Sequence, residues 1–420
     1  MAGYFNYSKE IRGLTGKEYN LLDTKDPNSL KLYATNDAAY VDPDDPGHTI
    51  PDTYEQITGI QGGDPRTPII GVPPMSGFLQ NFARDLNISK TDVARLKHIM
   101  NAFKPTDLPV TYELAKNFAL FDGWYASVPG PTTPNRLYIH TATSNGVYET
   151  TSDASPFEQR SIYDNLDEKN ITWKNYYSIF PELLFAKSLQ TKSGYSKMKK
   201  LEVFFADAKA GTLPQYSVVN PTFAGWPCFD SEPNDEHPPY SVANGEPFIK
   251  TIYEALRASP QWNSSLFIIT WDEHGGFYDN VPPPSNVPPP DNVTAPIFNF
   301  DRLGIRVPTL LISPWIKKGI IVHDPPKKGS YFEHTSILAT LKKIFGLPKF
   351  LTRRDAWAGT FEYLWDKVES PRTDTPTTLP NAPTSTNKSR KHRRSRVKAR
   401  DTSALEACMQ VKALVDQYLQ

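Results

Sequence analysis

The sequence predicts an α/β protein in which helices cover both faces of a mostly parallel sheet. Three short apolar runs that end in polar or turn residues have the composition of buried strands, at 216–219, 266–271 and 307–312. Between the first two, apolar residues recur at helical spacing over 247–259, and Pro260 follows as a stop signal. This order of strand, helix and strand is typical of a parallel sheet.

Length and composition fit one large folded domain with or without appendages. The 420 residues allow a sizeable core, and the 39% hydrophobic content describes a folded protein rather than a disordered or membrane-spanning one. The 39 prolines predict many ordered loops, because each proline restricts the backbone and removes an amide donor. Cys228 and Cys408 lie far apart and outside metal-binding spacings, which excludes a disulfide-rich scaffold and a zinc knuckle and leaves the redox compartment open.

The composition changes near residue 370, and we predict three parts. A core domain covers 1–369, a linker that is first rich in Pro and Thr and then basic covers 370–400, and a helix covers 401–420. Eight Lys or Arg residues lie within 388–400, while the rest of the chain is acidic. A nucleic-acid enzyme spreads its positive charge along a groove, so no nucleic-acid partner is expected.

The sequence also bears on the cellular location. No apolar run approaches the roughly 18 residues that span a bilayer. Residues 1–20 lack the basic and then apolar start of a signal peptide. We therefore expect a cytoplasmic or peripheral membrane protein, and a secreted or endomembrane one if a leader is missing from the sequence.

The strongest local signal for chemistry is the segment 271–279, which reads WDEHGGFYD and directly follows a predicted strand. The adjacent acidic residues Asp272 and Glu273 stand where the strand ends, so both can turn toward one hard cation. The two glycines that follow allow close approach of backbone or substrate. The alternative is a solvated turn that caps a helix.

A second candidate is the segment 127–136, which reads SVPGPTTPNR. A rigid loop that presents the hydroxyl of Thr132 suits a metal-activated nucleophile, and Arg136 can pair with phosphate oxygens. We assign Asn135 and Arg136 to the substrate phosphate. The alternative is a merely stiff loop.

Four histidines lie beside acidic or turn residues: His48, His237, His274 and His334. Histidine can donate a proton to a departing alkoxide and can stabilise developing charge near neutral pH, as a phosphoester site requires. The histidines at 98, 140 and 323 are interpreted as structural or surface residues.

Taken together, these segments resemble the phosphoesterase family that holds the plant non-specific phospholipases C and related bacterial phospholipases C and acid phosphatases. They occur in the family's order across roughly residues 14 to 375. The matching segments are 45–48, 121–129, 132–136, 234–238, 258–262, 272–279, 306–316, 333–334 and 353–360.

The resemblance implies a three-layer α/β/α fold like that of alkaline phosphatase. It implies cleavage of phospholipids such as phosphatidylcholine to diacylglycerol and a phosphorylated head group, with a divalent metal as cofactor. Thr132 is similar to the family's nucleophile and metal ligand, and Asp272 and Glu273 are similar to its other metal ligands. The residues similar to its proton donors or phosphate stabilisers are His48, His237, His274 and His334.

The implied partner is a phospholipid membrane surface, with peripheral binding to which the basic tail contributes on anionic lipid. Two alternatives stay open. One is a catalytically impaired family member that binds lipid and regulates, and the other is a phosphomonoesterase, because the family includes acid phosphatases.

The sequence departs from the family pattern at its start. Family members open with a buried apolar strand that ends in a Glu-Asn-Arg motif, whose Glu and Asn are metal ligands. Residues 1–12 offer neither the strand nor the motif, so we interpret the domain 1–369 as N-terminally incomplete. We expect a weakened metal site and exposed edges on the strands next to the missing one. Tyr240 and Asn280 also stand where the family usually has histidine.

Overall fold

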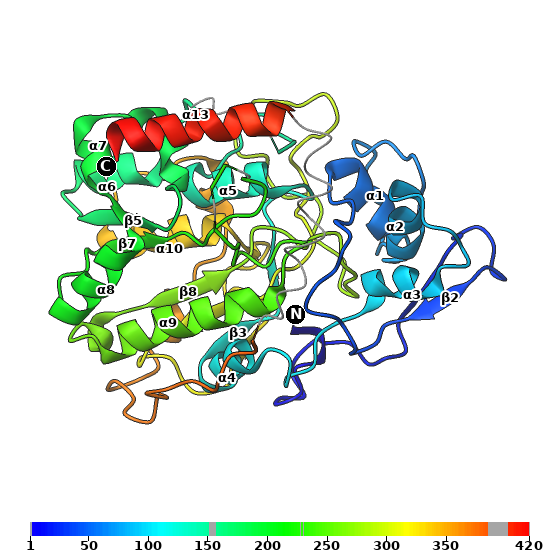
Figure 1. The fold of residues 1–420 in the computed structure, drawn as a ribbon, viewed down its shortest axis with the longest axis horizontal. Coiled ribbons are helices and arrows are strands. Elements are labelled where there is room, and N and C mark those ends of the chain that lie inside the picture. The colour runs from blue at the N-terminus through cyan, green and yellow to red at the C-terminus, as the bar shows by residue number, and fades with distance from the viewer. Residues whose placement is uncertain (1, 151–156, 227, 230, 385–401, 420) are drawn as a thin grey trace.

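The computed structural model describes residues 2–150, 157–226, 228–229, 231–384 and 402–419. Figure 1 shows a large body of strands and helices and, beside it, a smaller lobe. The lobe holds α1 (Ile50–Thr58), α2 (Phe78–Asp85), α3 (Val93–Leu96), β1 (Tyr19–Leu21) and β2 (Lys31–Tyr33). The helices of the body are α4 (Pro109–Asn117), α5 (Thr132–Thr141), α6 (Ile162–Glu168), α7 (Lys192–Ser196), α8 (Leu201–Ala210), α9 (Gly245–Ala258), α10 (Thr335–Phe345), α11 (Arg353–Trp357) and α13 (Thr402–Tyr418).

The strands of the body form two main sheets and one short pair. The first sheet has the order β10 (Ile320–Val322), β3 (Ala119–Phe121), β9 (Thr309–Ile312) and β8 (Phe267–Thr270). The second has the order β6 (Met198–Lys200), β5 (Trp173–Tyr177) and β7 (Tyr216–Val219), and all its pairings are parallel. The short parallel pair joins β11 (Phe332–Glu333) to β4 (Trp124–Tyr125).

The predicted α/β class is confirmed, and one strand departs from the parallel expectation. The apolar runs at 216–219, 266–271 and 307–312 are or contain β7, β8 and β9, and α9 covers almost all of the predicted helix. However, β9 runs antiparallel to both of its neighbours, β3 and β8. The connection from β8 to β9, residues 271–308, contains no helix, and a parallel return usually requires such a crossover.

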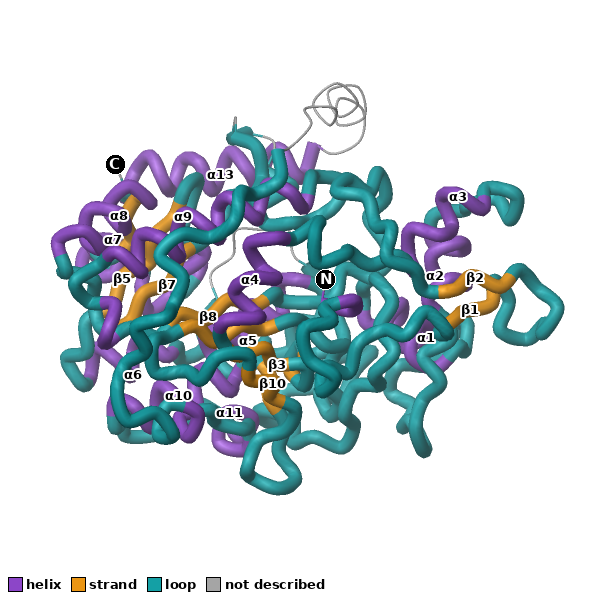
Figure 2. The backbone as a smooth tube through the Cα atoms, turned by 90° about the horizontal axis from the view of Figure 1, so that it is seen from below, coloured by secondary structure: helices purple, strands orange, loops and turns teal. Residues whose placement is uncertain are grey.

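Helices cover both faces of the sheets, which confirms the three layers (Figure 2). One core packs Phe121 of β3 and Leu311 of β9 together with side chains of α6 and α10. The other packs their sequence neighbours Leu120 and Leu310 with side chains of α4, α8 and α9. Successive side chains of a strand point to opposite faces, so the strands bury one half of their residues in each core.

The C-terminal segments pack on this body. In the described part of the predicted linker, Leu379 is buried and its N–H donates to Glu254 of α9. The basic run at 388–400 lies outside the described residues. A disulfide between Cys228 and Cys408 ties α13 to the body, a link that the cysteine spacing did not predict. Within the described residues, no helix has both the length and the apolar character to cross a bilayer.

Candidate active site

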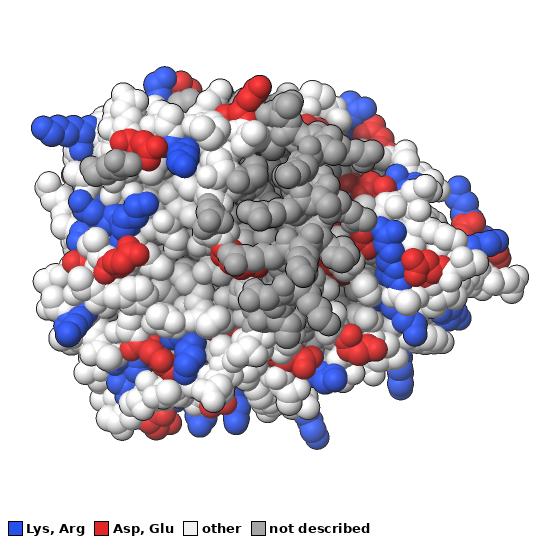
Figure 3. Space-filling model, in the orientation of Figure 1, with Lys and Arg blue, Asp and Glu red and all other residues white. Residues whose placement is uncertain are grey.

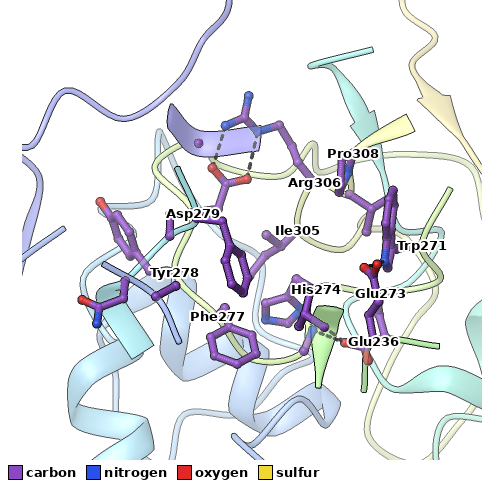
Figure 4. Close-up of a pocket in the computed structure, with 18 of the residues that line it drawn as sticks. Glu236, Trp271, Glu273, His274, Phe277, Tyr278, Asp279, Ile305, Arg306 and Pro308 are labelled. Carbon is purple, nitrogen blue, oxygen red and sulfur yellow. Dashed lines mark hydrogen bonds and ion pairs between the residues drawn. The ribbon is translucent and has the colours of Figure 1, made fainter. Parts of the chain in front are cut away.

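The candidate active site lies where β7 and β8 end and α5 begins. Asn220 directly follows β7, and Asp272 and Glu273 follow β8 after one residue. A cavity of about 260 Å³ is lined there by His237, Asp272 and Glu273. Figure 4 shows Glu273 and His274 on its wall. The carboxyl ends of strands are the usual position for sites in open α/β sheets.

Arg136 is held in this site by two carboxylates from different segments. Its Nε donates to Asp272 and its Nη1 donates to Glu182, each at 2.9 Å. The guanidinium carbon also lies 4.7 Å from the centre of the Phe223 ring, a cation–π contact. Burial alone would lower the pKa of Arg136, but the two carboxylates raise it above its ordinary value. The half-buried arginine is therefore charged.

Glu182 and His140 extend this network, and neither was predicted as a site residue. Glu182 Oε1 lies 3.2 Å from His140 Nε2 and also accepts a hydrogen bond from Asn220. Burial would raise the pKa of Glu182, but His140 and Arg136 hold it well below its ordinary value. His140 Nδ1 lies 3.0 Å from the Tyr163 hydroxyl. No local pattern marks Glu182, because its partners are distant in sequence.

Thr132 is the first residue of α5 and is half-buried. The side chain of Asn135 fixes the loop before it: Oδ1 accepts from the N–H of Val128, and Nδ2 donates to three carbonyls within 128–131. This geometry gives Asn135 a role in positioning the loop, and its contact with substrate phosphate stays a prediction. Thr132 and Arg136 are four residues apart, so they share one face of α5.

Two of the four predicted histidines, His48 and His237, lie close together with their rings edge-on, and His237 lines the cavity. Their ring centres are 6.1 Å apart, and His48 lies 3.8 Å from Asp45 and 4.0 Å from Glu273. The His48 Nδ1–H donates to the carbonyl of Pro46. Burial would lower the pKa of His48, but Glu273 and Asp45 raise it to about 9. The short distance between the two rings is consistent with the prediction that both histidines belong to one site.

His274 lines the cavity, whereas His334 is fully buried outside its lining. His274 Nε2–H donates to Gln56 of α1 at 2.8 Å, and burial lowers the pKa of His274 to about 3. His334 Nε2–H donates to the backbone carbonyl of Asp272 at 2.7 Å, and its Nδ1 accepts from Trp124. Burial also lowers the pKa of His334. Both rings are thus neutral, and His334 directly positions the Asp272 backbone.

Glu236 is a further acidic residue of the cavity that sequence reasoning did not select. Its carboxylate accepts from Trp271 Nε1 at 3.0 Å, and both side chains are labelled in Figure 4. Burial raises the pKa of Glu236 to about 8, and the charge of Glu246 acts in the same direction. A carboxyl group that keeps its proton at neutral pH can donate a hydrogen bond or a proton. The sequence offered one signal for Glu236, which was its position directly before the predicted site residue His237.

The donor atoms of the site fit a divalent metal. Asp45, His48 and His237 each offer a ligand atom, and these atoms all lie within 4.8 Å of one another. Asp272 and Glu273 add carboxylate oxygens, whose other protein partners include backbone N–H groups. Hard divalent cations prefer such oxygen ligands, and imidazole extends the set to transition metals.

A second acidic group with a histidine is formed by Asp42, Asp44 and His98, and both Asp42 and His98 line the cavity as well. There Arg95 donates two hydrogen bonds to Asp44, each at 2.6 Å. The positive charge of the guanidinium already neutralises this carboxylate. This carboxylate is therefore less available to a metal ion than those of the first group.

The chain matches known proteins over most of its length. The model of the Phosphoesterase family matches residues 2–348. Non-specific phospholipase C1 of Arabidopsis thaliana is 46% identical over 381 residues, which are 88% of this chain and 69% of that protein. Non-specific phospholipase C3 of the same plant is 43% identical, over 91% of this chain and 73% of that protein.

Similarity extends to bacterial proteins and to solved structures. Phospholipase C B of Mycobacterium tuberculosis is 30% identical over 66% of this chain and 58% of that protein. A solved protein of the alkaline phosphatase superfamily from Vibrio parahaemolyticus matches with a TM-score of 0.38 and 14% identity, over 76% of this chain and 83% of that one. On the extent of the family match and the identity to the plant proteins, this chain belongs to the Phosphoesterase family.

Proposed function

We propose that this protein is a phospholipase C, a phosphoric diester hydrolase that cleaves phospholipids such as phosphatidylcholine to diacylglycerol and a phosphorylated head group. The observation that carries the proposal is the Arg136 network. It places a charged guanidinium one helical turn after the Thr132 hydroxyl and anchors it to Asp272 at 2.9 Å. This network supports a site in which the Thr132 hydroxyl acts together with Arg136 and the carboxylates of Asp272 and Glu273, and the plant relatives carry the matching name.

In the proposed reaction, the Thr132 Oγ1 attacks phosphorus as its proton passes to solvent. The bond from phosphorus to the diacylglycerol oxygen breaks, and His48 or His237 gives a proton to that oxygen. Water then hydrolyses the phosphothreonine, which releases the phosphorylated head group and restores the hydroxyl. Nε and Nη1 of Arg136 are held by carboxylates, which leaves Nη2 for a phosphate oxygen.

Thr132, Asp272 and Glu273 would hold the predicted metal, with the group of Asp45, His48 and His237 beside them. A divalent cation supplies positive charge that lowers the pKa of a bound hydroxyl and offsets charge on the phosphate. His334 contributes by fixing the backbone that carries Asp272.

Access to a membrane surface is part of the proposal. In the loop between α1 and α2, Ile70 and Val72 are 95% and 83% exposed, which places two apolar side chains in water. Apolar loop residues of this kind can enter the interfacial layer of a bilayer. On the face seen in Figure 3, charges of both signs are interspersed over the described surface. We propose peripheral binding through this loop, assisted on anionic lipid by the basic run at 388–400.

The test is release of phosphocholine from phosphatidylcholine vesicles, with and without added divalent metal. Thr132→Ala is expected to lower kcat by at least about 100-fold, because it removes the nucleophile. The matched control is Thr133→Ala, which removes the adjacent hydroxyl and should retain activity within about threefold. Equal activity of the Thr132 variant and the parent would contradict the assignment. Faster cleavage of a soluble phosphomonoester than of vesicles would favour the phosphomonoesterase alternative.

A further inference from the structure

Two backbone segments of the active site touch although they come from different parts of the fold. Segment 45–48 leads into α1 of the lobe, and segment 272–276 follows β8 of the body (Figure 1). A Cβ atom on Gly276 would lie 2.7 Å from the carbonyl oxygen of Gly47, and the φ of Gly276 is 77°. Only glycine allows this conformation at so close an approach. The lobe and the body therefore meet inside the active site.

The side chain of Gln56 in α1 joins the two segments. Its Nε2 donates to the carbonyl of Gly47 at 2.6 Å, and its Oε1 accepts from the Nε2–H of His274 at 2.8 Å. Nε2 also donates to Oδ1 of Asn81 in α2 at 3.0 Å. Gln56 is 1% exposed, so these contacts are made away from water. One amide group therefore makes three hydrogen bonds and connects both segments.

The orientation of this amide is fixed from the side of the lobe. Asn81 donates from Nδ2 to the carboxylate of Asp52 at 2.9 Å. A carboxylate accepts and does not donate, so Asn81 presents its oxygen to Gln56, and Gln56 presents its own oxygen to His274. Every donor in this series points from the body to the lobe. Reversal of one amide would break the hydrogen bonds on both of its sides.

The bridge bears on the chemistry because a charged site residue stands beside each of its ends. His48 directly follows Gly47, and Glu273 directly precedes His274. His48 Nε2 lies 4.0 Å from Glu273 Oε1. A tilt of the lobe changes this separation, since α1 begins two residues after His48. A shift of about 1 Å between groups that act together can lower a rate by about 100-fold.

We propose that Gln56 is a positioning residue of the active site. Its side-chain amide holds segment 45–48 against segment 272–276 and so sets the spacing of His48 and Glu273. The link between the segments stands on the contacts alone, whereas its effect on catalysis rests on the proposed function.

Gln56→Met tests the bridge, because methionine has nearly the same length and makes none of the three hydrogen bonds. The matched control is Gln80→Met in α2 of the same lobe. Gln80 is also buried and also has three hydrogen bonds, two from Thr24 and one to Glu55, and neither partner belongs to the two segments. Both variants should lose similar stability in urea unfolding, so a difference between them at the site reports the bridge.

Hydrogen exchange is the first readout and requires no activity. Gln56→Met is expected to speed amide exchange in both 45–49 and 272–277 by at least about tenfold, because the amide no longer holds the two segments together. Gln80→Met should leave exchange in these segments within about threefold of the parent. Unchanged exchange in Gln56→Met, or equal acceleration in both variants, would overturn the proposal.

Asn81→Leu is a milder variant for the case in which Gln56→Met does not fold. It keeps the partners of Gln56 in the two segments and removes only the contact that fixes the amide from α2. Exchange in 45–49 and 272–277 should rise by at least about threefold, because the amide of Gln56 is then free to rotate. Exchange as slow as in the parent would also overturn the proposal.

Steady-state kinetics on soluble dihexanoylphosphatidylcholine with added divalent metal give the catalytic readout. Gln56→Met should lower kcat by about 10–100-fold and change KM by no more than about threefold, because it disturbs groups that act in the chemical step and leaves Arg136 in place. Gln80→Met should retain kcat within about threefold. Equal loss of kcat in both variants would contradict a positioning role. If exchange responds as expected and the parent does not cleave the lipid, the bridge stands and the proposed function falls.

Discussion

Glu182→Gln is the sharpest perturbation of the Arg136 network, because it removes a charge and nearly preserves shape. Glu182 accepts a hydrogen bond from Arg136 at 2.9 Å and lies 3.2 Å from His140 Nε2. Breaking a buried ion pair outright costs about 3–5 kcal/mol, but Asp272 still neutralises Arg136 in the variant. Weakening one charge-assisted hydrogen bond and one nearby charge contact leads to an expected loss of about 2–3 kcal/mol in unfolding free energy at neutral pH.

The pKa of Glu182 determines how the stability difference between parent and variant changes with pH. His140 and Arg136 hold the pKa of folded Glu182 below its ordinary value of 4.5, although burial opposes them. The ionised carboxylate therefore stabilises the fold fully above that ordinary value. This contribution is lost as the pH falls through the lower pKa of the folded state. The difference between parent and variant should be constant from about pH 7 to about pH 5 and should shrink in more acidic buffer.

The assay is urea unfolding followed by tryptophan fluorescence at several pH values. The matched control is Glu158→Gln, which removes a carboxylate that pairs at 3.2 Å with Lys187 on the surface, where Glu158 is 69% exposed. Its unfolding free energy should change by no more than about 0.5 kcal/mol. An unchanged midpoint for Glu182→Gln at neutral pH would refute the reasoning. A loss that persists undiminished in acid would also refute it, because the charge would not be its cause.

Two further variants test the surroundings of the site. Replacement of both Ile70 and Val72 by Ser removes two exposed apolar side chains from the proposed membrane contact. The affinity for phosphatidylcholine vesicles in a flotation assay should fall by about tenfold or more, while hydrolysis of a soluble substrate is kept. Unchanged flotation would exclude this loop as the membrane contact. Cys408→Ser should make α13 more susceptible to limited proteolysis and lower the thermal midpoint by several degrees, because the disulfide closes a loop of 180 residues. An identical cleavage pattern in parent and variant would show that packing of Val411 and Val415 alone holds the helix.

The sequence by itself determined the local features of this protein. β7 matches the predicted run at 216–219 residue for residue, and β8 lies inside the predicted 266–271. Both follow from continuous apolar runs bounded by turn residues, which are local signals. The positions of Asp272 and Glu273 at the end of β8 follow from the same signal. The three layers follow from the alternation of strands and helices.

The tertiary structure decided how distant residues combine. Arg136 meets Glu182 and Asp272 from separate segments, and no sequence period encodes such a meeting. The charges around the histidines separate them: burial lowers the pKa values of His274 and His334, whereas nearby carboxylates raise the pKa of His48 to about 9. A pKa depends on the charges and the solvent within a few ångströms, which only the fold brings together.

The edges of the sheet show the same division. The sequence predicted β7 and β8 as strands but not their partners. In the structure each pairs on one side only, and both line one cavity. The structure also sets β9 antiparallel and pairs Cys228 with Cys408. Strand composition is a local property, whereas pairing is a choice among partners that only the packed layers resolve.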